Sequence, residues 1–523
     1  MQSNRILFWC SGVVLLLAIF FRFWQLGQVP HGMTWDEAAI GYNGYAVITT
    51  RRDEWLERLP ISFRSFGDYK APLAIYINGI STAVFGMTLW AVRFPFAMAG
   101  AMSIFGFGFL VYLLLPSEKR RLEWAVVGSM LLALSPWHIH FSRIGFESGM
   151  SLFFATWGWV GLLFLLQLKR VEKPIHFVLI GITTTFLAAA LYTYHSPKLV
   201  VPLVTLALFV YQWKVSRFKR GLLLRSVVVS VVWLILLSPL VKDVLLGVGG
   251  ARMSELVFFQ PNSTTSVWVT IWQNTLVQLS PSFLLEGATT TLRHGGRFWG
   301  YLYPTTYVFA LLGMTAIFYK KMRLLSLLAV ALVFIGSLPA ILGSEVPHSN
   351  RALFALLGYL LLAISGGRLL FQIFTQDHVR TSLIGMSILL HLLFVTSFFQ
   401  QYFVIFAQAS AADFQDGYLE AFEIARAYEL GELGKPPVEK ILFSSVYGQP
   451  YIYALFVRQT NPIWYRGGSL QLYEFSDRIS TADLLRENTL IVATPDQNVP
   501  IEQATRIVIG SDGKVRFAVY VTK

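Results

Sequence analysis

The segment that decides the membrane topology reads PLAIYINGISTAVF, residues 72–85. It is apolar, but it includes Asn78, Ser81 and Thr82. At about 14 residues it is shorter than the roughly 20 residues that cross a bilayer as a helix. Its length and its polar residues are typical of an interfacial or re-entrant helix, so we expect it to lie parallel to the membrane.

Apolar runs of about 20 residues recur over roughly the first 400 positions, as in transmembrane helices. If residues 72–85 do not cross, all the basic loops face the side of Arg5, and if they cross, all these loops lie outside. Basic loops stay in the cytoplasm, so the sequence predicts about 11 spans and a cytoplasmic N-terminus. We expect the spans at 6–21, 94–115, 124–141, 149–168, 175–194, 197–213, 226–246, 301–319, 324–342, 352–371 and 382–404. The basic loops are Lys119-Arg120-Arg121, Lys169-Arg170-Lys173, Lys214-Arg217-Lys219-Arg220-Arg225, Lys320-Lys321-Arg323 and Arg380.

The composition indicates the same class of protein. Of the 523 residues, 55% are hydrophobic and 14% are charged, whereas about a quarter are charged in a soluble protein. The predicted fold class is therefore a polytopic all-α membrane protein. Much of the net charge of +13 lies in short loops, where it meets anionic lipid headgroups, and we expect no nucleic-acid partner. Cys10 is the only cysteine, which excludes an internal disulfide and a cysteine-based metal site.

The sequence divides into a transmembrane domain, 1–405, and a small extracytoplasmic α/β domain, 406–523. The run 6–21 has no small-residue cleavage site before Arg22, so we expect an uncleaved signal-anchor. A second membrane-parallel amphipathic helix is expected at 264–279. The C-terminal domain has no nucleotide fingerprint, phosphate loop or zinc spacing. Its expected elements are a helix at 414–430 and strands at 441–444, 490–493, 507–509 and 515–521.

Residues 27–93 form the first outer loop, and this loop holds the first candidate catalytic residues. Asp36 and Glu37 are an acidic pair just beyond a span, and such a carboxylate can act as a general base on an acceptor hydroxyl or amine. Acidic residues also favour a helix N-terminus, and both interpretations can hold together. Lys70 precedes the 72–85 segment and can hold the phosphate of a lipid carrier, although a lysine also extends to headgroups at any interface.

Further polar residues fall in the later outer loops. Arg143 and Glu147 are four residues apart, and they either form an ion pair on a helix surface or contact sugar or phosphate in a cavity wall. His195 and, in a late loop, His348 with Arg351 lie at outer ends of spans, where such residues are structural or line the same outer cavity. No histidine spacing supports a metal site. The sequence therefore implies no certain cofactor and leaves a requirement for a divalent cation open.

Three motifs in chain order resemble one family. They are W-D-E at 35–37, D-Y-K-x-P-L at 68–73 and V-R-F-P at 92–95. This order resembles the bacterial dolichol- or polyprenyl-phosphate-dependent glycosyltransferases of family 39. That group includes the protein O-mannosyltransferases and the lipid A aminoarabinose transferases, which share the membrane-embedded C-type glycosyltransferase (GT-C) fold. The resemblance covers about residues 1–405.

The resemblance implies roles for individual residues. Asp36 matches the family's catalytic aspartate, with Glu37 beside it. Lys70 matches the lysine that binds the carrier phosphate, and Tyr69 precedes it in the same motif, although Ala71 replaces the first proline of the family's K-P-P-L. Glu147 is similar to the acidic residue that the family carries in its second outer loop. Arg351 is similar to the basic residue that the family often has near the carrier in a late outer loop.

The sequence therefore predicts an inverting glycosyltransferase in a plasma membrane of bacterial type, with the C-terminal domain extracytoplasmic. The expected partners are a polyprenyl-phosphate-linked sugar donor, an acceptor that is a protein, lipid or glycan, and membrane lipids. Asp36 would take the acceptor proton, and Lys70, with Arg143 or Arg351, would hold the leaving phosphate. The alternatives are a lipid-linked-glycan flippase or transporter, which would place ionisable residues near the bilayer midplane, and a surface-polysaccharide ligase or polymerase.

Overall fold

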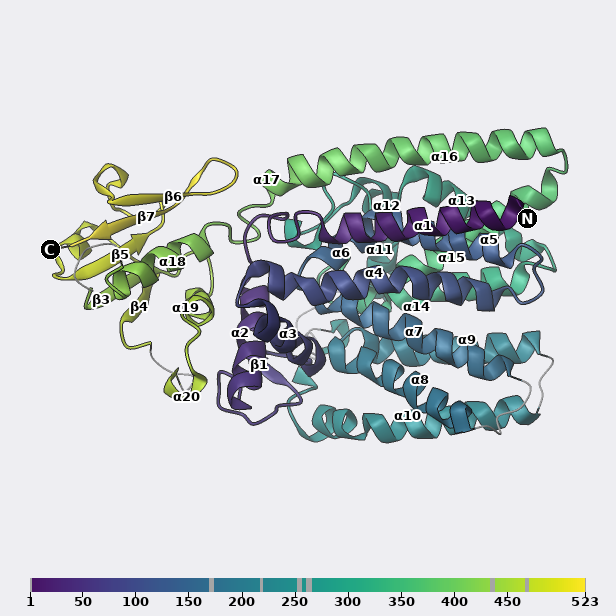
Figure 1. The fold of residues 1–523 in the computed structure, drawn as a ribbon, viewed down its shortest axis with the longest axis horizontal. Coiled ribbons are helices and arrows are strands. Elements are labelled where there is room, and N and C mark those ends of the chain that lie inside the picture. Colours follow the sequence, from purple (N-terminus) through teal and green to yellow (C-terminus); the bar gives the residue numbers. More distant parts are fainter. Residues whose placement is uncertain are drawn as a thin grey trace. The chain divides into compact units, whose positions relative to one another are not determined.

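The computed structural model describes residues 2–168, 174–216, 220–251, 256–259, 266–432, 438–465 and 470–522. The chain forms two compact units (Figure 1). The helical unit contains Met1–Trp24, Tyr69–Leu73 and Phe96–Gln401, and the mixed unit contains Gln25–Asp68, Ala74–Pro95 and Tyr402–Lys523. Of the basic-loop residues, Lys169, Arg170, Lys173, Arg217 and Lys219 lie outside the described ranges.

Long apolar helices make up most of the helical unit. Within the described ranges, eight helices are long and apolar enough to cross a membrane, which confirms the predicted polytopic helical class. They are α4 (Leu89–Leu114), α7 (Glu147–Gln167), α8 (Pro174–Thr193), α9 (Pro197–Val215), α10 (Arg220–Leu246), α14 (Arg323–Ile341), α15 (Ala355–Ile373) and α16 (Asp377–Gln400) with the turns that continue it.

The other expected spans correspond to a helix at the start of the chain, to a helix with a following turn, and to two separate helices. Residues 6–21 lie in α1 (Gln2–Phe23), and 301–319 contains α13 (Pro304–Thr315) and the turn η4 (Ala316–Phe318). The expected span 124–141 divides into α5 (Arg121–Leu134) and α6 (Pro136–Arg143). The helix breaks because Ser135 is extended (ψ 121°) and Pro136 has no N–H to continue the ladder. The number of spans stays a prediction.

Two buried arginines cap helix ends in the helical unit. Arg22 donates to the carbonyls of Ala133 (2.5 Å) and Leu132 (3.2 Å), which the end of α5 leaves without a helical partner. Arg143 donates to the carbonyl of Phe21 (3.0 Å) near the end of α1. Both side chains are fully buried. Both guanidinium groups therefore satisfy backbone carbonyls inside the unit.

Helix packing in this unit depends on close backbone approach. The helices lie side by side in Figure 1, and α13 packs against α15. A Cβ atom at Gly313 of α13 would lie 1.9 Å from the carbonyl oxygen of Leu362 on α15. Small residues at such crossings let apolar helices pack tightly where lipid gives no hydrophobic driving force.

The described part of the loop after α10 contains the turn η2 (Val257–Phe259) and further short elements. They are α11 (Val267–Gln278), α12 (Pro281–Glu286) and the turn η3 (Leu292–His294). The helix expected at 264–279 is therefore present from residue 267, with residue 264 outside the described ranges. Trp268 and Trp272 on α11 are 74% and 63% exposed. Exposed tryptophans on one amphipathic helix are typical of a membrane interface.

The mixed unit combines the first loop with the C-terminal region. Its loop elements are α2 (Trp35–Thr50), β1 (Phe63–Ser65) and most of α3 (Pro72–Phe85), whose bounds coincide with the segment predicted to be a short helix. The hairpin strand β2 (Asp68–Lys70) precedes α3. After α16 come η5 (Gln401–Phe406), α17 (Ala407–Ala409), α18 (Tyr418–Glu429), α19 (Pro450–Arg458) and α20 (Pro462–Tyr465).

A five-stranded mixed sheet completes this unit. Its strands are β3 (Lys440–Ser444), β4 (Tyr473–Ser476), β5 (Thr489–Ala493), β6 (Arg506–Ile509) and β7 (Val515–Val521), in the order β4-β3-β5-β7-β6. The pairs β3–β4 and β3–β5 are parallel, and β5–β7 and β6–β7 are antiparallel. The four predicted strands are confirmed, and β4 was not predicted. The predicted helix at 414–430 begins later because Gly417 has a positive φ of 93°.

One hydrophobic core joins α2 to the C-terminal elements. Tyr42 of α2 and Met33 just before it are buried with Tyr418, Phe422 and Tyr453. The Tyr453 hydroxyl donates to the carbonyl of Met33 (2.7 Å), and the Tyr42 hydroxyl donates to the carbonyl of Thr460 (2.8 Å). The helix that carries the acidic pair is thus fixed on a packed α/β core.

Candidate active site

The helical unit brings Lys70 and Glu147 together. Lys70 is the last residue of β2, and Glu147 is the first residue of α7. Lys70 Nζ lies 4.0 Å from Glu147 Oε1, and the two side chains are 9% and 8% exposed. A cation buried beside one carboxylate, at a helix N-terminus that favours anions, can interact strongly with a phosphate because little water screens it.

His195 fixes the strand that carries Lys70. It lies between α8 and α9, and its Nε2 is 2.8 Å from the carbonyl oxygen of Tyr69. Lys198 Nζ lies 3.4 Å from His195 Nδ1, so Nδ1 can accept from the ammonium while the protonated Nε2 donates to the carbonyl. The predicted residues Tyr69, Lys70, Glu147 and His195 therefore lie together, with a second lysine that the sequence did not single out.

The late loop between α14 and α15 reaches the same end of the helical unit. Asn350 Nδ2 donates to the hydroxyl of Tyr194, the neighbour of His195 (3.1 Å). The next residue, Arg351, is half-buried, and its backbone N–H donates to His348 Nδ1 (3.3 Å). The rings of His348 and His294 lie 4.3 Å apart between centroids. This loop thus adds imidazole and guanidinium groups from distant parts of the sequence.

Arg143 occupies a different environment from the one expected for a ligand contact. Its side chain is fully buried, and its Nη1 donates to the carbonyl of Phe21. This contact supports a structural role at the end of α1. A role for Arg143 in binding sugar or phosphate stays a prediction.

Asp36 lies in the mixed unit, in the first turn of α2. Thr34 is the N-cap: its hydroxyl accepts from the backbone N–H of Glu37 (3.2 Å), and Glu37 Oε2 accepts from the backbone N–H of Thr34 (3.0 Å). This reciprocal capping box fixes where the helix begins. Asp36 is half-buried, between the fully buried Glu37 and the half-buried Trp35. The positive end of the helix dipole favours the ionised form of a carboxylate at this position.

Arg93 forms an ion pair with the same Glu37 carboxylate. Its Nε donates to Glu37 Oε1 (2.7 Å), and its Nη2 donates to Glu37 Oε2 (3.3 Å). Arg93 also donates to the carbonyls of Pro30 and Gly32, each at 2.8 Å. Glu37 and Arg93 are 1% and 0% exposed. The Glu37 carboxylate is thus held by the cap and by the ion pair with Arg93, whereas Asp36 is only half-buried.

A role for Arg93 was not predicted from the sequence, and neither was a second acidic pair. Asp53 and Glu54 follow α2 and are almost fully buried. Asn43 donates to Glu54 Oε1 (3.3 Å) and accepts from the backbone N–H of Glu54 (3.0 Å). Burial raises the pKa of Glu54 to about 8 and the pKa of Asp53 to about 6. The available signal was the run D-E-W in an otherwise basic stretch.

The described ranges contain no group of three His, Cys, Asp or Glu residues that could hold a metal ion. The helical unit offers a buried lysine beside Glu147, on a strand that His195 contacts, which suits a phosphate. The mixed unit offers a carboxylate at a helix N-terminus, which suits a proton acceptor.

No protein-family model and no curated protein matches the chain. ArnT from Cupriavidus metallidurans in the apo state is a similar solved structure, with a TM-score of 0.53 and 13% identity over 99% of this chain and 98% of that chain. The structure of the same protein bound to undecaprenyl phosphate has a TM-score of 0.52 and 13% identity, over 99% of this chain and 98% of that chain. The apo oligosaccharyltransferase from Archaeoglobus fulgidus has a TM-score of 0.52 and 15% identity, over 86% of this chain and 63% of that chain. The chain has the GT-C fold.

This result confirms the fold that the three motifs implied. The GT-C likeness extends over nearly the whole chain, including the C-terminal domain, to which the motifs assigned nothing. At 13–15% identity the likeness establishes the fold, and the assignment of activity depends on the side chains of this chain.

Proposed function

We propose that this protein transfers a sugar from a polyprenyl-phosphate-linked donor to an acceptor. The observation that carries the proposal is the buried Lys70–Glu147 pair at 4.0 Å, held by His195 in a chain with a GT-C fold. One similar structure was solved with undecaprenyl phosphate bound. The chemistry that would recognise such a ligand, a lysine with little access to water, is present here.

Asp36 is the proposed general base. The acceptor oxygen or nitrogen attacks the anomeric carbon of the donor, and the acceptor proton passes to the Asp36 carboxylate. As the new bond forms, the bond between the anomeric carbon and the phosphate oxygen breaks. The polyprenyl phosphate leaves with the electron pair of that bond, and attack from the opposite face inverts the anomeric carbon.

Lys70 is proposed to stabilise the leaving phosphate. Negative charge grows on the phosphate oxygens as the bond breaks, and a preorganised cation with little access to water interacts strongly with it. Glu147 and His195 are proposed to position Lys70 and its strand, and Arg351 to contribute further positive charge. Glu37 and Arg93 are proposed to position Asp36 by fixing the first turn of α2.

The proposed location of this chemistry is the extracytoplasmic face of a plasma membrane of bacterial type. The positive-inside distribution of the basic loops supports this orientation. Nucleotide sugars are confined to the cytoplasm, and a lipid carrier delivers the activated sugar to the other side. The acceptor, whether a protein, lipid or glycan, would be met on that side.

Binding of the carrier phosphate tests the role of Lys70. Purified protein in detergent is titrated with a short-chain polyprenyl phosphate, and the bound fraction is measured by native mass spectrometry. We expect Lys70→Met to weaken binding by about tenfold or more, since a charge-assisted contact contributes roughly 1.5–3 kcal/mol. Lys70→Arg keeps the charge and should keep most of the affinity.

Lys320→Met is the matched control, because Lys320 is an exposed lysine in the loop between η4 and α14. It removes the same charge and should leave binding unchanged. Equal affinity of the wild type, Lys70→Met and Lys320→Met for the polyprenyl phosphate would overturn the role proposed for Lys70.

A further inference from the structure

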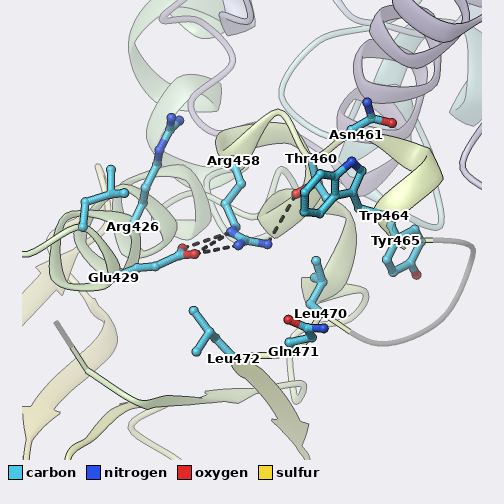
Figure 2. A pocket seen from close by; sticks show the side chains of 11 residues that line it. Arg426, Glu429, Arg458, Thr460, Asn461, Trp464, Tyr465, Leu470, Gln471 and Leu472 are labelled. Carbon is cyan, nitrogen blue, oxygen red and sulfur yellow. Dashed lines mark hydrogen bonds and ion pairs between the residues drawn. The ribbon is translucent and has the colours of Figure 1, made fainter.

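A separate cavity lies within the mixed unit, beside the sheet. Its volume is about 420 Å³, within the range of roughly 300–1,000 Å³ that is typical of small-molecule sites. The ends of α18 and α19, the short helix α20 and the segment before β4 surround it (Figure 2). The side chains that matter for the argument are Glu429, Arg458, Thr460, Asn461, Trp464 and Gln471.

Trp464 supplies an apolar wall. Its side chain lines the cavity from α20 and is 83% exposed (Figure 2). The neighbouring Tyr465 stacks with Tyr451, but the described ranges give the indole of Trp464 no such ring partner. A large flat apolar surface left open at the edge of a cavity is suited to stacking against a flat ligand.

An ion pair forms a rigid polar surface in the same cavity. Arg458 Nη2 donates to Glu429 Oε1 (2.6 Å), and Arg458 Nε donates to Glu429 Oε2 (3.0 Å). Arg458 Nη1 donates to Thr460 Oγ1 (3.4 Å), and the Tyr473 hydroxyl donates to Glu429 Oε2 (3.4 Å). The charges of Arg458 and Glu429 compensate each other. The pair therefore offers fixed donors and acceptors to a ligand and adds little net charge. Arg426 also lines the cavity, and its Nη1 donates to the backbone carbonyl of Val457.

Two side-chain amides add hydrogen-bonding capacity. Asn461 Oδ1 accepts from the backbone N–H of Ile463 (2.9 Å), which orients this amide at the start of α20. Gln471 lines the cavity from the segment before β4. An amide presents a donor and an acceptor side by side, an arrangement that matches two neighbouring hydroxyl groups of a sugar.

We propose that this cavity is a carbohydrate-binding site for a neutral sugar residue of a glycan. The apolar face of the sugar ring, formed by its C–H groups, stacks on Trp464. The hydroxyl groups at its edge hydrogen-bond to the Glu429–Arg458 pair and to the amides of Asn461 and Gln471. The site is separate from the residues proposed for sugar transfer, so the inference does not depend on that function.

A membrane anchor is the alternative explanation for an exposed tryptophan. Ile463, beside Trp464, is 46% exposed, and both could insert into a bilayer. Insertion would bring the Glu429–Arg458 pair and the amide of Asn461 out of water, and polar groups at membrane depth are costly. The polar lining therefore favours a sugar over lipid.

Direct binding tests the proposal. Full-length protein in a sugar-free detergent is titrated with the trisaccharides of glucose, mannose and N-acetylglucosamine, and binding is followed by saturation-transfer difference NMR. We expect at least one trisaccharide to bind at millimolar concentration or below. Trp464→Ala should weaken that binding by about tenfold or more, and Trp464→Tyr, which keeps an aromatic face, should retain most of it.

Leu485→Ala is the matched control, because Leu485 is 84% exposed in the same unit and is absent from the cavity lining. It should bind as the wild type does. The proposal is overturned if no trisaccharide binds at millimolar concentration, or if Trp464→Ala and Leu485→Ala bind equally. It is also overturned if a nitroxide label attached through Ile463→Cys, in a Cys10→Ser background that keeps Trp464, reports bilayer depth when the protein is in lipid nanodiscs. No donor is present, so failure of sugar transfer would not affect the result.

Discussion

The Glu37–Arg93 pair gives the sharpest prediction about the architecture that holds Asp36. Arg93→Met removes the partner of the Glu37 carboxylate, which is 1% exposed, together with the hydrogen bonds from Arg93 to the carbonyls of Pro30 and Gly32. Breaking a buried ion pair from one side costs about 3–5 kcal/mol because the other charge stays buried without compensation. A loss of 1 kcal/mol lowers the midpoint temperature of thermal unfolding by roughly 2–4 °C for a unit of this size, so this midpoint should fall by about 6–20 °C.

The matched control is an exposed pair in the same unit. Arg486 Nη1 lies 2.8 Å from Glu474 Oε2, and the side chains are 36% and 53% exposed. Exposed pairs contribute about 0–1 kcal/mol, so Arg486→Met should lower the midpoint by a few degrees at most. The double variant Glu37→Gln/Arg93→Met should recover part of the loss, because it no longer buries an isolated charge.

The assay is thermal unfolding of the purified protein in detergent, followed by circular dichroism at matched heating rates. Arg93→Met is expected to unfold well below both the wild type and Arg486→Met. If Arg93→Met and Arg486→Met had the same midpoint, the buried pair would not be what fixes the first turn of α2, and the positioning role of Glu37 would be lost.

Two further predictions concern stability. Burial raises the pKa of Glu54 from 4.5 to about 8, so the folded state holds a proton that the unfolded state releases. The contribution of this group to the free energy of unfolding is full below about pH 4.5 and is lost as the pH rises through about 8. In the wild type the thermal-unfolding midpoint should fall between these pH values, and in Glu54→Gln it should fall less. The same dependence of the midpoint on pH in both proteins would contradict this. Gly313→Ala should lower the midpoint in detergent, because its Cβ would meet the Leu362 carbonyl at 1.9 Å, whereas Gly385→Ala, with nothing within 4 Å, should not. Equal midpoints for these two variants would contradict the close packing of α13 against α15.

The sequence predicted the features that depend on local pattern. The segment 72–85 is a short helix with those bounds, because its length and its polar residues limit what it can form. Four strands of the C-terminal sheet were predicted from their branched and apolar residues. The strand β4 was not, because YEFS has one acidic residue among four and little of the branched content that marks a strand.

Features that depend on distant residues could not be predicted. Arg93 and Glu37 are 56 residues apart, and nothing in either neighbourhood indicates the other. The same holds for Lys70 and Glu147, which come from different loops. The residues of the candidate site were found by type and by resemblance, but their partners, and the packing of α2 on the C-terminal core, depend on the tertiary fold.

The measurement that tests the central claim most directly is release of the carrier phosphate from a donor. Purified protein in detergent is incubated with a panel of polyprenyl-phosphate sugars and candidate acceptors, and free polyprenyl phosphate is followed over a single turnover. The wild type, Asp36→Asn and Glu420→Gln are compared. Glu420 is the control because it is an exposed carboxylate in the first turn of α18, so its replacement removes the same charge from the same kind of helix position.

Sugar transfer with Asp36 as the base predicts release by the wild type and by Glu420→Gln, and loss of about two to four orders of magnitude in rate for Asp36→Asn, which is the usual contribution of a general base. Thermal unfolding at the wild-type midpoint would show that Asp36→Asn is folded. Full release by folded Asp36→Asn would contradict the assignment of the base. No release by the wild type with any donor and acceptor would contradict the transferase and direct attention to lipid translocation.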